Sequence, residues 1–187
     1  MSDPVRIPGR CDVAGRLDAP GADHVVVACP PDPREGGSRS DPRLRAVGDA
    51  LAPAVACLRF DYGDCERPRT AARGDAERVL SWARGRFDRV GLFGYSFGAG
   101  VALRAADAAD ACSVLAPPAD AAGALDAVDS PLQVVVGERD TTVDWAPVAD
   151  RAAALGQPVE TLPATHRFRR DRDRVGRLVA DFLIERL

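Results

Sequence analysis

The sequence predicts an α/β fold in which a mostly parallel sheet of about six to eight strands is covered by helices on both faces, giving a three-layer α/β/α sandwich. Short apolar runs alternate along the chain with longer segments of helical periodicity, which is the order of a parallel sheet with crossover helices. The apolar runs also lack a regular polar alternation, which is typical of strands buried on both faces.

The expected elements follow from these runs and from the residues that end them. Six segments are expected to be strands: residues 24–29, 55–60, 89–94, 112–115, 132–136 and 159–162. Five segments are expected to be helices: residues 41–51, 74–87, 97–108, 144–155 and 172–187. Asp41 is the expected N-cap of the first helix, with Pro42 at the first helical position. The first twenty residues are expected to add one or two antiparallel edge strands.

Length and composition restrict the class of protein. The length of 187 residues suits a single domain (1–187), and 46% apolar with 28% charged residues is an ordinary soluble globular composition. The net charge of −3 speaks against non-specific binding to nucleic acid. No run approaches the ~18 apolar residues of a membrane span, so no membrane partner is expected. Every basic residue is arginine, which excludes a lysine nucleophile or a P-loop lysine.

The cysteines and histidines give no sign of a metal site or of a disulfide framework. The five cysteines are odd in number, widely spaced and form no CxxC pair, so we expect a reduced, cytoplasmic protein. The two histidines belong to no ligand set with metal-site spacing, so no metal is expected. The glycines near residue 94 do not have the GxGxxG spacing of a dinucleotide site, and no cofactor is expected.

The strongest functional signal is the pentapeptide Gly94-Tyr95-Ser96-Phe97-Gly98, which directly follows an expected strand and precedes an expected helix. A GxSxG motif in this context is typical of a tight turn that lifts the serine hydroxyl above the sheet. The backbone N–H of Phe97 would point into the same space and could stabilise an oxyanion. The alternative interpretation is a glycine-rich turn that only packs a helix closely against the sheet.

A serine nucleophile needs a base, and the chain has two histidines. His24 opens a strand and precedes Ser96, whereas His166 lies in a loop after the last expected strand. Because parallel strands end at the same edge of a sheet, His166 is the expected base and His24 is expected to have a structural role. Asp140 follows the strand at residues 132–136 and is the expected acid, which would orient the imidazole. Other carboxylates remain as alternatives: Glu138, Asp144 and Asp120.

Three segments together resemble the α/β-hydrolase family: Gly-Tyr-Ser-Phe-Gly at 94–98, Val-Gly-Glu-Arg-Asp at 136–140 and Thr-His-Arg-Phe at 165–168. The segment 58–64 is similar to the small lidless members, the dienelactone-hydrolase-like serine esterases, and the likeness runs from about residue 24 to the end of the chain. The segment 117–131 is too short for a cap domain.

This resemblance implies a catalytic triad of Ser96, Asp140 and His166. It implies hydrolysis of a carboxylic ester or thioester through an acyl-serine, with a small-molecule acyl ester or thioester as substrate. Dienelactone hydrolases proper use a cysteine nucleophile, so their specific activity is not implied here.

One segment departs from the family pattern. The family usually has His-Gly or His-Pro before the oxyanion loop, whereas this chain has Pro30-Pro31-Asp32-Pro33. Three of these four residues have no N–H, so Asp32 is the expected second oxyanion donor and Arg34 the next candidate. Loss of one such donor costs about 2.7–4 kcal/mol of transition-state stabilisation. The alternative function is therefore a catalytically lapsed hydrolase-fold binding protein.

A run of five arginines follows His166: Arg167, Arg169, Arg170, Arg172 and Arg174. We interpret the run first as the solvated start of the last helix, partly neutralised by Asp171 and Asp173. The alternative interpretation is a patch that binds an anionic substrate, such as a phosphate-bearing thioester.

Overall fold

A computed structural model describes residues 2–9, 11–63 and 70–187 and contains one sheet of eight strands, in the order β1-β2-β4-β3-β5-β6-β7-β8. The strands are β1 (Ser2–Ile7), β2 (Val13–Asp18), β3 (His24–Cys29), β4 (Ala56–Phe60), β5 (Arg89–Tyr95), β6 (Ala111–Leu115), β7 (Leu132–Gly137) and β8 (Val159–Leu162). Strands β3 to β8 are paired in parallel, while β1 pairs with β2 and β2 with β4 in antiparallel fashion. The expected sheet is thus confirmed, and the first twenty residues supply two edge strands.

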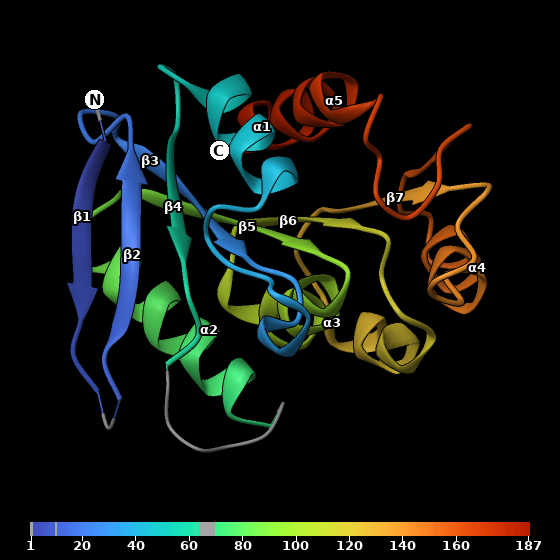
Figure 1. Cartoon of the computed structure of the whole chain (residues 1–187), viewed down its shortest axis with the longest axis horizontal. Helices are drawn as coiled ribbons and strands as arrows, with labels where there is room; N and C mark the ends of the chain where they lie inside the picture. Colours follow the sequence, from blue (N-terminus) through green and yellow to red (C-terminus); the bar gives the residue numbers. More distant parts are fainter. Residues whose placement is uncertain (1, 10, 64–69) are drawn as a thin grey trace.

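The helices form a layer on each side of this sheet (Figure 1). The α-helices are α1 (Pro42–Leu51), α2 (Thr70–Arg84), α3 (Phe97–Ala105), α4 (Ala146–Ala154) and α5 (Arg172–Ile184). The 3-10 helices are η1 (Pro33–Glu35), η2 (Ala106–Ala108) and η3 (Ala119–Ala127). Helices α1 and α5 pack against each other on one face, and α2, α3, α4 and η3 cover the other. The expected three-layer sandwich without a cap domain is confirmed.

The two helical layers enclose two hydrophobic clusters that share the central strands. In β3, Val25 and Val27 contribute to the cluster under α2 and α3, whereas Val26 and Ala28 contribute to the cluster under α1 and α5. All four side chains are fully buried. This is why the strand is a continuous apolar run, since successive side chains of a strand point to opposite faces.

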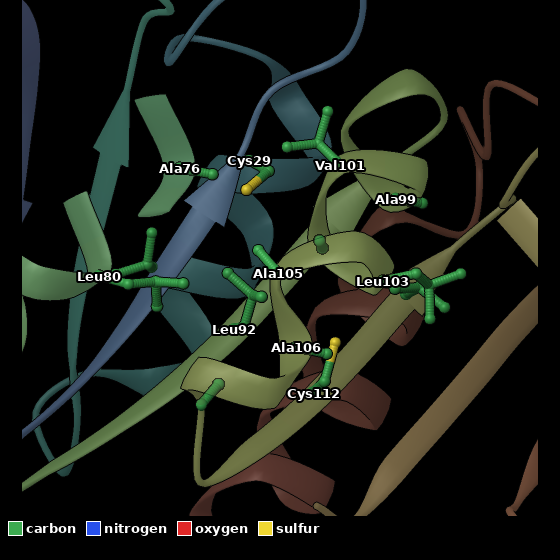
Figure 2. Close-up of a cluster of buried hydrophobic side chains, with 14 of the residues drawn as sticks. Cys29, Ala76, Leu80, Leu92, Ala99, Val101, Leu103, Ala105, Ala106 and Cys112 are labelled. Atoms are coloured by element: carbon green, nitrogen blue, oxygen red, sulfur yellow. The ribbon is translucent and has the colours of Figure 1, made fainter. Parts of the chain in front are cut away.

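Small side chains let α3 approach the sheet closely. Figure 2 shows Ala105, the last residue of α3, near Leu92 of β5, and Ala106, the first residue of η2, near Cys112 of β6. Helix α3 begins at Phe97, two residues after the end of β5 at Tyr95. The turn that carries Ser96 is therefore positioned by core packing on its helical side.

Several element boundaries differ from the sequence prediction. Helix α2 begins at Thr70 and not at Gly74, and Gly74 lies in open space on the outer side of the helix, with no atom within 4 Å of the position that a Cβ would take. The helix expected at 97–108 changes to 3-10 geometry after Ala105, and the segment 117–131 contains η3, which the sequence did not predict. Differences of this kind are common at helix ends, where hydrogen bonding is incomplete.

The cysteines differ in state. Cys29, Cys57 and Cys112 are free and fully buried. Burial raises the pKa of the Cys57 and Cys112 thiols to about 12, and it raises that of Cys29 as well, so these groups stay protonated at neutral pH. Cys11 is disulfide-bonded, so the expected reduced state does not hold for this residue. Cys65 lies outside the described residues.

Candidate active site

Ser96 occupies the turn between β5 and α3 with φ of 55° and ψ of −119°. A positive φ is unfavourable for a residue with a side chain and is found where surrounding structure enforces it. The serine N–H donates to the Leu115 carbonyl of β6 at 2.9 Å, and the serine carbonyl accepts the N–H of Ala99 at 2.9 Å. The strained turn is therefore held by the neighbouring strand on one side and by the first turn of α3 on the other.

The two glycines of the motif are required by close backbone contacts. A Cβ at Gly94 would lie 2.2 Å from the Gly98 carbonyl oxygen. A Cβ at Gly98 would lie 2.3 Å from the Cys29 carbonyl oxygen and 2.4 Å from that of Pro30. The turn thus contacts the start of the loop that follows β3, where the second oxyanion donor was expected.

His166 and Asp140 complete a hydrogen-bonded chain with Ser96. The His166 Nε2 atom lies 3.0 Å from Ser96 Oγ, and its Nδ1 atom lies 2.7 Å from Asp140 Oδ2. The side chain of His166 is 12% exposed and that of Asp140 is 0% exposed. The other oxygen of Asp140 accepts the N–H groups of Thr142 and Val143, at 2.8 and 3.3 Å. Both carboxylate oxygens of Asp140 are therefore hydrogen-bonded, which fixes the orientation of the carboxylate relative to the His166 ring.

Backbone contacts between the ends of β7 and β8 bring the acid and the histidine together. The N–H of Glu138 donates to the Leu162 carbonyl at 2.9 Å, and that of Arg139 donates to the Ala164 carbonyl at 3.0 Å. A Cβ at Gly137 would lie 2.5 Å from the Ala164 oxygen, so only glycine permits this approach. The two loops therefore run side by side, although 26 residues separate Asp140 from His166.

The alternative candidates lie elsewhere. His24 begins β3 opposite Arg89, the first residue of β5, whereas Ser96 follows the last residue of that strand. At about 3.3 Å per residue, the length of β5 separates the two, so His24 is not brought to Ser96. Asp120 pairs with Arg104 at 3.2 Å. Glu138 and Asp144 are exposed, and neither hydrogen bonds to the His166 ring.

Asp32 begins a compact turn in the loop after β3. Its carboxylate accepts the backbone N–H of Arg34 at 3.0 Å and contacts the Arg34 guanidinium at 2.7 and 3.1 Å. Asp32 is the N-cap of η1, which explains why Pro33 and Arg34 follow it in a helical turn. The negative charge of Asp32 is thus neutralised by Arg34, which lowers its repulsion of any anion nearby.

Tyr95 is a site residue that the sequence did not identify. Its hydroxyl donates to the His166 carbonyl at 3.0 Å, and its ring lies 5.4 Å from the imidazole ring. The Arg43 guanidinium lies over the Tyr95 ring, 4.4 Å from its centre. Burial raises the pKa of Tyr95 to about 12, so the hydroxyl remains a donor. Its position inside the GxSxG motif was the available signal.

A cleft of about 680 Å³ is lined by Ser96, Phe97 and His166 together with Asp32. Three of the five arginines after His166 also line it: Arg167, Arg169 and Arg172. The Nε atom of Arg172 is buried and has no hydrogen-bond partner among the described residues. Three carboxylates also line the cleft: Asp41 pairs with Arg43 at 2.5 Å and Asp32 with Arg34 at 2.7 Å, which leaves Glu35 to face the arginines after His166. The cleft lining is therefore positively charged overall.

A second hollow, of about 530 Å³, lies between α1 and α5 and contains none of the residues just described except Arg172. In the described part of the chain, no group of three or more His, Cys, Asp or Glu side chains could hold a metal ion. None of the helices in the described ranges is long and apolar enough to cross a membrane.

Comparison with known proteins agrees with the fold. No protein-family model and no curated protein sequence matches this chain. Among solved structures, it is similar to a lidless α/β serine hydrolase from Xanthomonas campestris, with 25% identity over 99% of this chain and 94% of the other, and a TM-score of 0.81. It is similar to dienelactone hydrolase from Anabaena variabilis, with 22% identity over 100% and 98% and a TM-score of 0.86. It is also similar to an esterase from Pyrococcus furiosus, with 17% identity over 100% and 91% and a TM-score of 0.84.

The chain therefore has the fold of the α/β hydrolases. More narrowly, the unbroken sheet and the absence of a cap between the described strands place its fold with the small lidless serine hydrolases, as the sequence resemblance implied.

Proposed function

We propose that this protein is a serine hydrolase that cleaves a carboxylic ester or thioester through an acyl-serine intermediate. The observation that carries the proposal is the chain of two hydrogen bonds that joins Ser96 Oγ through the His166 ring to Asp140. A nucleophile within reach of a base, which is itself oriented by a third group, is the arrangement that activates serine. The similarity of the fold to an esterase and to a dienelactone hydrolase supports an ester bond as the target.

In the proposed acylation step, Ser96 Oγ attacks the carbonyl carbon while His166 Nε2 takes the hydroxyl proton. Asp140 accepts the hydrogen bond from Nδ1–H and stabilises the imidazolium that forms. When the tetrahedral intermediate collapses, the alcohol or thiol leaves with the proton from His166. A water molecule then loses a proton to His166 and attacks the acyl-serine, which releases the carboxylic acid and restores the serine hydroxyl.

The tetrahedral intermediate carries negative charge on oxygen and needs donors. We assign these roles to the backbone N–H groups of Phe97 and Asp32, both of which line the cleft beside Ser96. Phe97 is the first residue of α3, where the helix dipole favours negative charge. The Arg34 guanidinium on the Asp32 carboxylate supports the second assignment, because it offsets the charge that would oppose an oxyanion.

The substrate class follows from the shape and charge of the cleft. Without a cap domain the site is open, which suits a small-molecule ester or thioester. Arg167, Arg169 and Arg172 line the cleft, and of its three carboxylates Asp32 and Asp41 are paired with Arg34 and Arg43, which supports a negatively charged group on the substrate. The four arginines of the lining outnumber its three carboxylates, which favours the anionic-substrate interpretation for these three arginines, whereas Arg170 and Arg174 do not line the cleft.

A fluorophosphonate probe tests the proposal directly. We expect one label, mapped by mass spectrometry to Ser96, and no label in Ser96→Ala. Ser81→Ala removes an exposed serine of α2 and serves as the matched control. Absence of a label on Ser96 in the folded protein, with wild-type turnover retained in Ser96→Ala, would refute the proposed nucleophile.

The lapsed binding protein is separated from the enzyme by turnover. The observation that favours it is the proline-rich segment at Pro30–Pro33, which offers few N–H donors. Measurable hydrolysis of p-nitrophenyl acetate that disappears in His166→Ala supports the enzyme. No hydrolysis by the wild-type protein, together with tight binding of an ester ligand, supports the binding protein.

A further inference from the structure

The loop at residues 30–40, which carries the proposed second oxyanion donor, is anchored by side chains from the end of β4. Tyr62 contacts the start of the loop, and Asp61 and Arg59 contact its end. We call Arg59, Asp61 and Tyr62 the β4 clamp. None of the three hydrogen bonds to Ser96 or His166, so any contribution they make to catalysis is indirect.

Tyr62 connects the loop with the helix that supplies the first oxyanion donor. Its hydroxyl donates to the Pro30 carbonyl at 3.1 Å. Its ring contacts Phe97 edge-on, with centroids 5.7 Å apart and an angle of 81° between the planes, and it contacts Phe60 in the same manner. Burial raises the pKa of Tyr62 well above its ordinary value, so the hydroxyl stays a donor at any working pH. One side chain therefore supports both segments assigned to the oxyanion hole.

The other end of the loop is held through the backbone of Arg39. The Asp61 carboxylate accepts the Arg39 N–H at 2.6 Å and also forms an ion pair with the Arg39 guanidinium. The Arg59 guanidinium donates to the Arg39 carbonyl at 2.6 Å and to Asp18 of β2 at 2.7 Å. Both backbone polar groups of Arg39 are thus bound by side chains at the end of β4, which fixes where the loop ends.

The segment that follows β4 and anchors the loop is itself hydrogen-bonded to two other elements, β2 and α2. The N–H of Asp61 donates to the Ala14 carbonyl of β2 at 2.9 Å. The N–H of Gly63 donates to the Asp75 carboxylate of α2 at 2.8 Å. The end of β4 is therefore held by a strand and by a helix, so it can serve as a rigid support for the loop.

Between the two anchored ends of the loop, contacts with Gly37 orient the peptide group that joins Pro31 to Asp32. The Gly37 N–H donates to the Asp32 carbonyl at 3.0 Å, and a Cβ at Gly37 would lie 2.3 Å from the Pro31 carbonyl oxygen. The Pro31 oxygen thus faces Gly37. Because a trans peptide directs its C=O and N–H to opposite sides, the Asp32 N–H faces away from Gly37. Movement of Pro30 or Arg39 would rotate this peptide.

We propose that Tyr62 and Asp61 are positioning residues that hold the Pro30–Ser40 loop so that the Asp32 N–H is preorganised for the oxyanion. The proposal rests on the serine-hydrolase function proposed above. The segment 30–33 has one backbone N–H, that of Asp32, and no local sequence signal that would orient it. The contacts of the clamp residues with the loop provide this orientation instead. Preorganised donors lower the barrier without reorganisation during the reaction, which is why their placement affects kcat.

Two variants test the proposal in steady-state kinetics with p-nitrophenyl acetate. Tyr62→Phe keeps the ring contacts and removes the hydroxyl, and Asp61→Ala removes the carboxylate that binds Arg39. Each should lower kcat by about 10-fold, with KM within about twofold of wild type, because a displaced donor weakens transition-state binding more than substrate binding. Asp126→Ala removes an exposed carboxylate that pairs with Arg151 and takes no part in the hydrogen bonds that anchor the loop, and it should leave both constants unchanged.

Amide hydrogen exchange gives a readout that does not depend on activity. In both clamp variants, peptides covering residues 31–40 should exchange faster than in wild type, while peptides of β6 and β7 exchange as before. Wild-type kcat in both variants, or a lowered thermal midpoint with unchanged kcat, would overturn the proposal. Unchanged exchange in the loop would overturn the clamp itself. An unlabelled Ser96 in the wild-type protein would instead refute the serine-hydrolase function, which the exchange experiment does not test.

Discussion

Strain at Ser96 has an identifiable source at the level of single residues. The positive φ of Ser96 is maintained because its N–H is bound to Leu115 and because glycines at 94 and 98 remove the side chains that would separate β5, α3 and the loop after β3. The hydroxyl consequently points out of the turn toward His166 and does not cap α3. A glycine-rich turn that only packs a helix against the sheet would not require a serine with positive φ.

A methyl group at Gly98 should disrupt the turn. Gly98→Ala would place a Cβ 2.3 Å from the Cys29 oxygen, so the backbone must shift, and we expect a loss of about 1–3 kcal/mol in the free energy of unfolding together with loss of Ser96 labelling. Gly123→Ala is the matched control, because no atom lies within 4 Å of its Cβ position. Urea denaturation and probe labelling check the prediction, and equal behaviour of the two variants would contradict it.

The two nearby carboxylates Asp140 and Asp144 should differ sharply in their effect on turnover. Asp140→Asn keeps the size of the side chain but stabilises the wrong imidazole tautomer, and the corresponding change in a serine protease lowers kcat by about 10⁴-fold. We expect a loss of at least about 10³-fold here. Asp144→Asn should retain wild-type kcat, since Asp144 is exposed and does not contact His166. Similar activities in the two variants would show that Asp140 is not the acid.

At the scale of elements, the site is assembled where β3, β5, β7 and β8 end. These strands run parallel in one sheet, so the segments that follow them emerge at the same edge. Each contributes one part: the loop with Asp32, the turn with Ser96, the loop with Asp140 and the loop with His166. Binding sites in open α/β sheets are commonly found at this edge.

The arginines of the segment between β8 and α5 should determine whether the protein prefers a negatively charged substrate. The variant with Arg167→Gln and Arg169→Gln should raise KM for the mono-p-nitrophenyl ester of succinic acid by about 10-fold, since charge-assisted hydrogen bonds are worth about 1.5–3 kcal/mol. Turnover of p-nitrophenyl acetate should change little. The control carries Arg170→Gln and Arg174→Gln, which remove the same charge outside the cleft. An equal effect of both variants on both esters would indicate that these arginines only solvate the start of α5.

At the scale of the whole molecule, two buried clusters flank the sheet and keep several ionisable groups away from water. Burial raises the pKa of Cys57 and Cys112 from 9.0 to about 12, and that of Tyr95 from 10.0 to about 12. These groups are neutral in the folded protein over a range of pH in which the unfolded chain ionises. The core therefore makes stability depend on pH on the alkaline side.

The free energy of unfolding should fall as pH rises from about 9 to about 12, because unfolding then releases protons that the folded state retains. Below about pH 9 these groups are protonated in both states, so their contribution there is constant. Urea denaturation at intervals of pH checks the prediction. Cys112→Ala removes one of these groups and should give a shallower decline than wild type, and a flat profile for the wild-type protein would contradict the assignment.

The sequence by itself determined the central strands, the helices between them, and the position of Ser96, Asp140 and His166 in the chain. These depend on local signals: continuous apolar runs, a GxSxG turn between a strand and a helix, and a polar residue after each strand. It also identified Asp32 as the residue of the segment 30–33 that can donate an N–H.

Only the tertiary structure decided what holds these residues in place. The contact of Tyr95 with the His166 carbonyl joins residues 71 positions apart, and that of Tyr62 with Pro30 joins residues 32 positions apart. The arginines after His166 have the same sequence pattern whether or not they line the cleft, and only the path of the chain from β8 into α5 separates the two groups. Such contacts depend on how the strands are ordered and how the helices pack, which a local pattern does not encode.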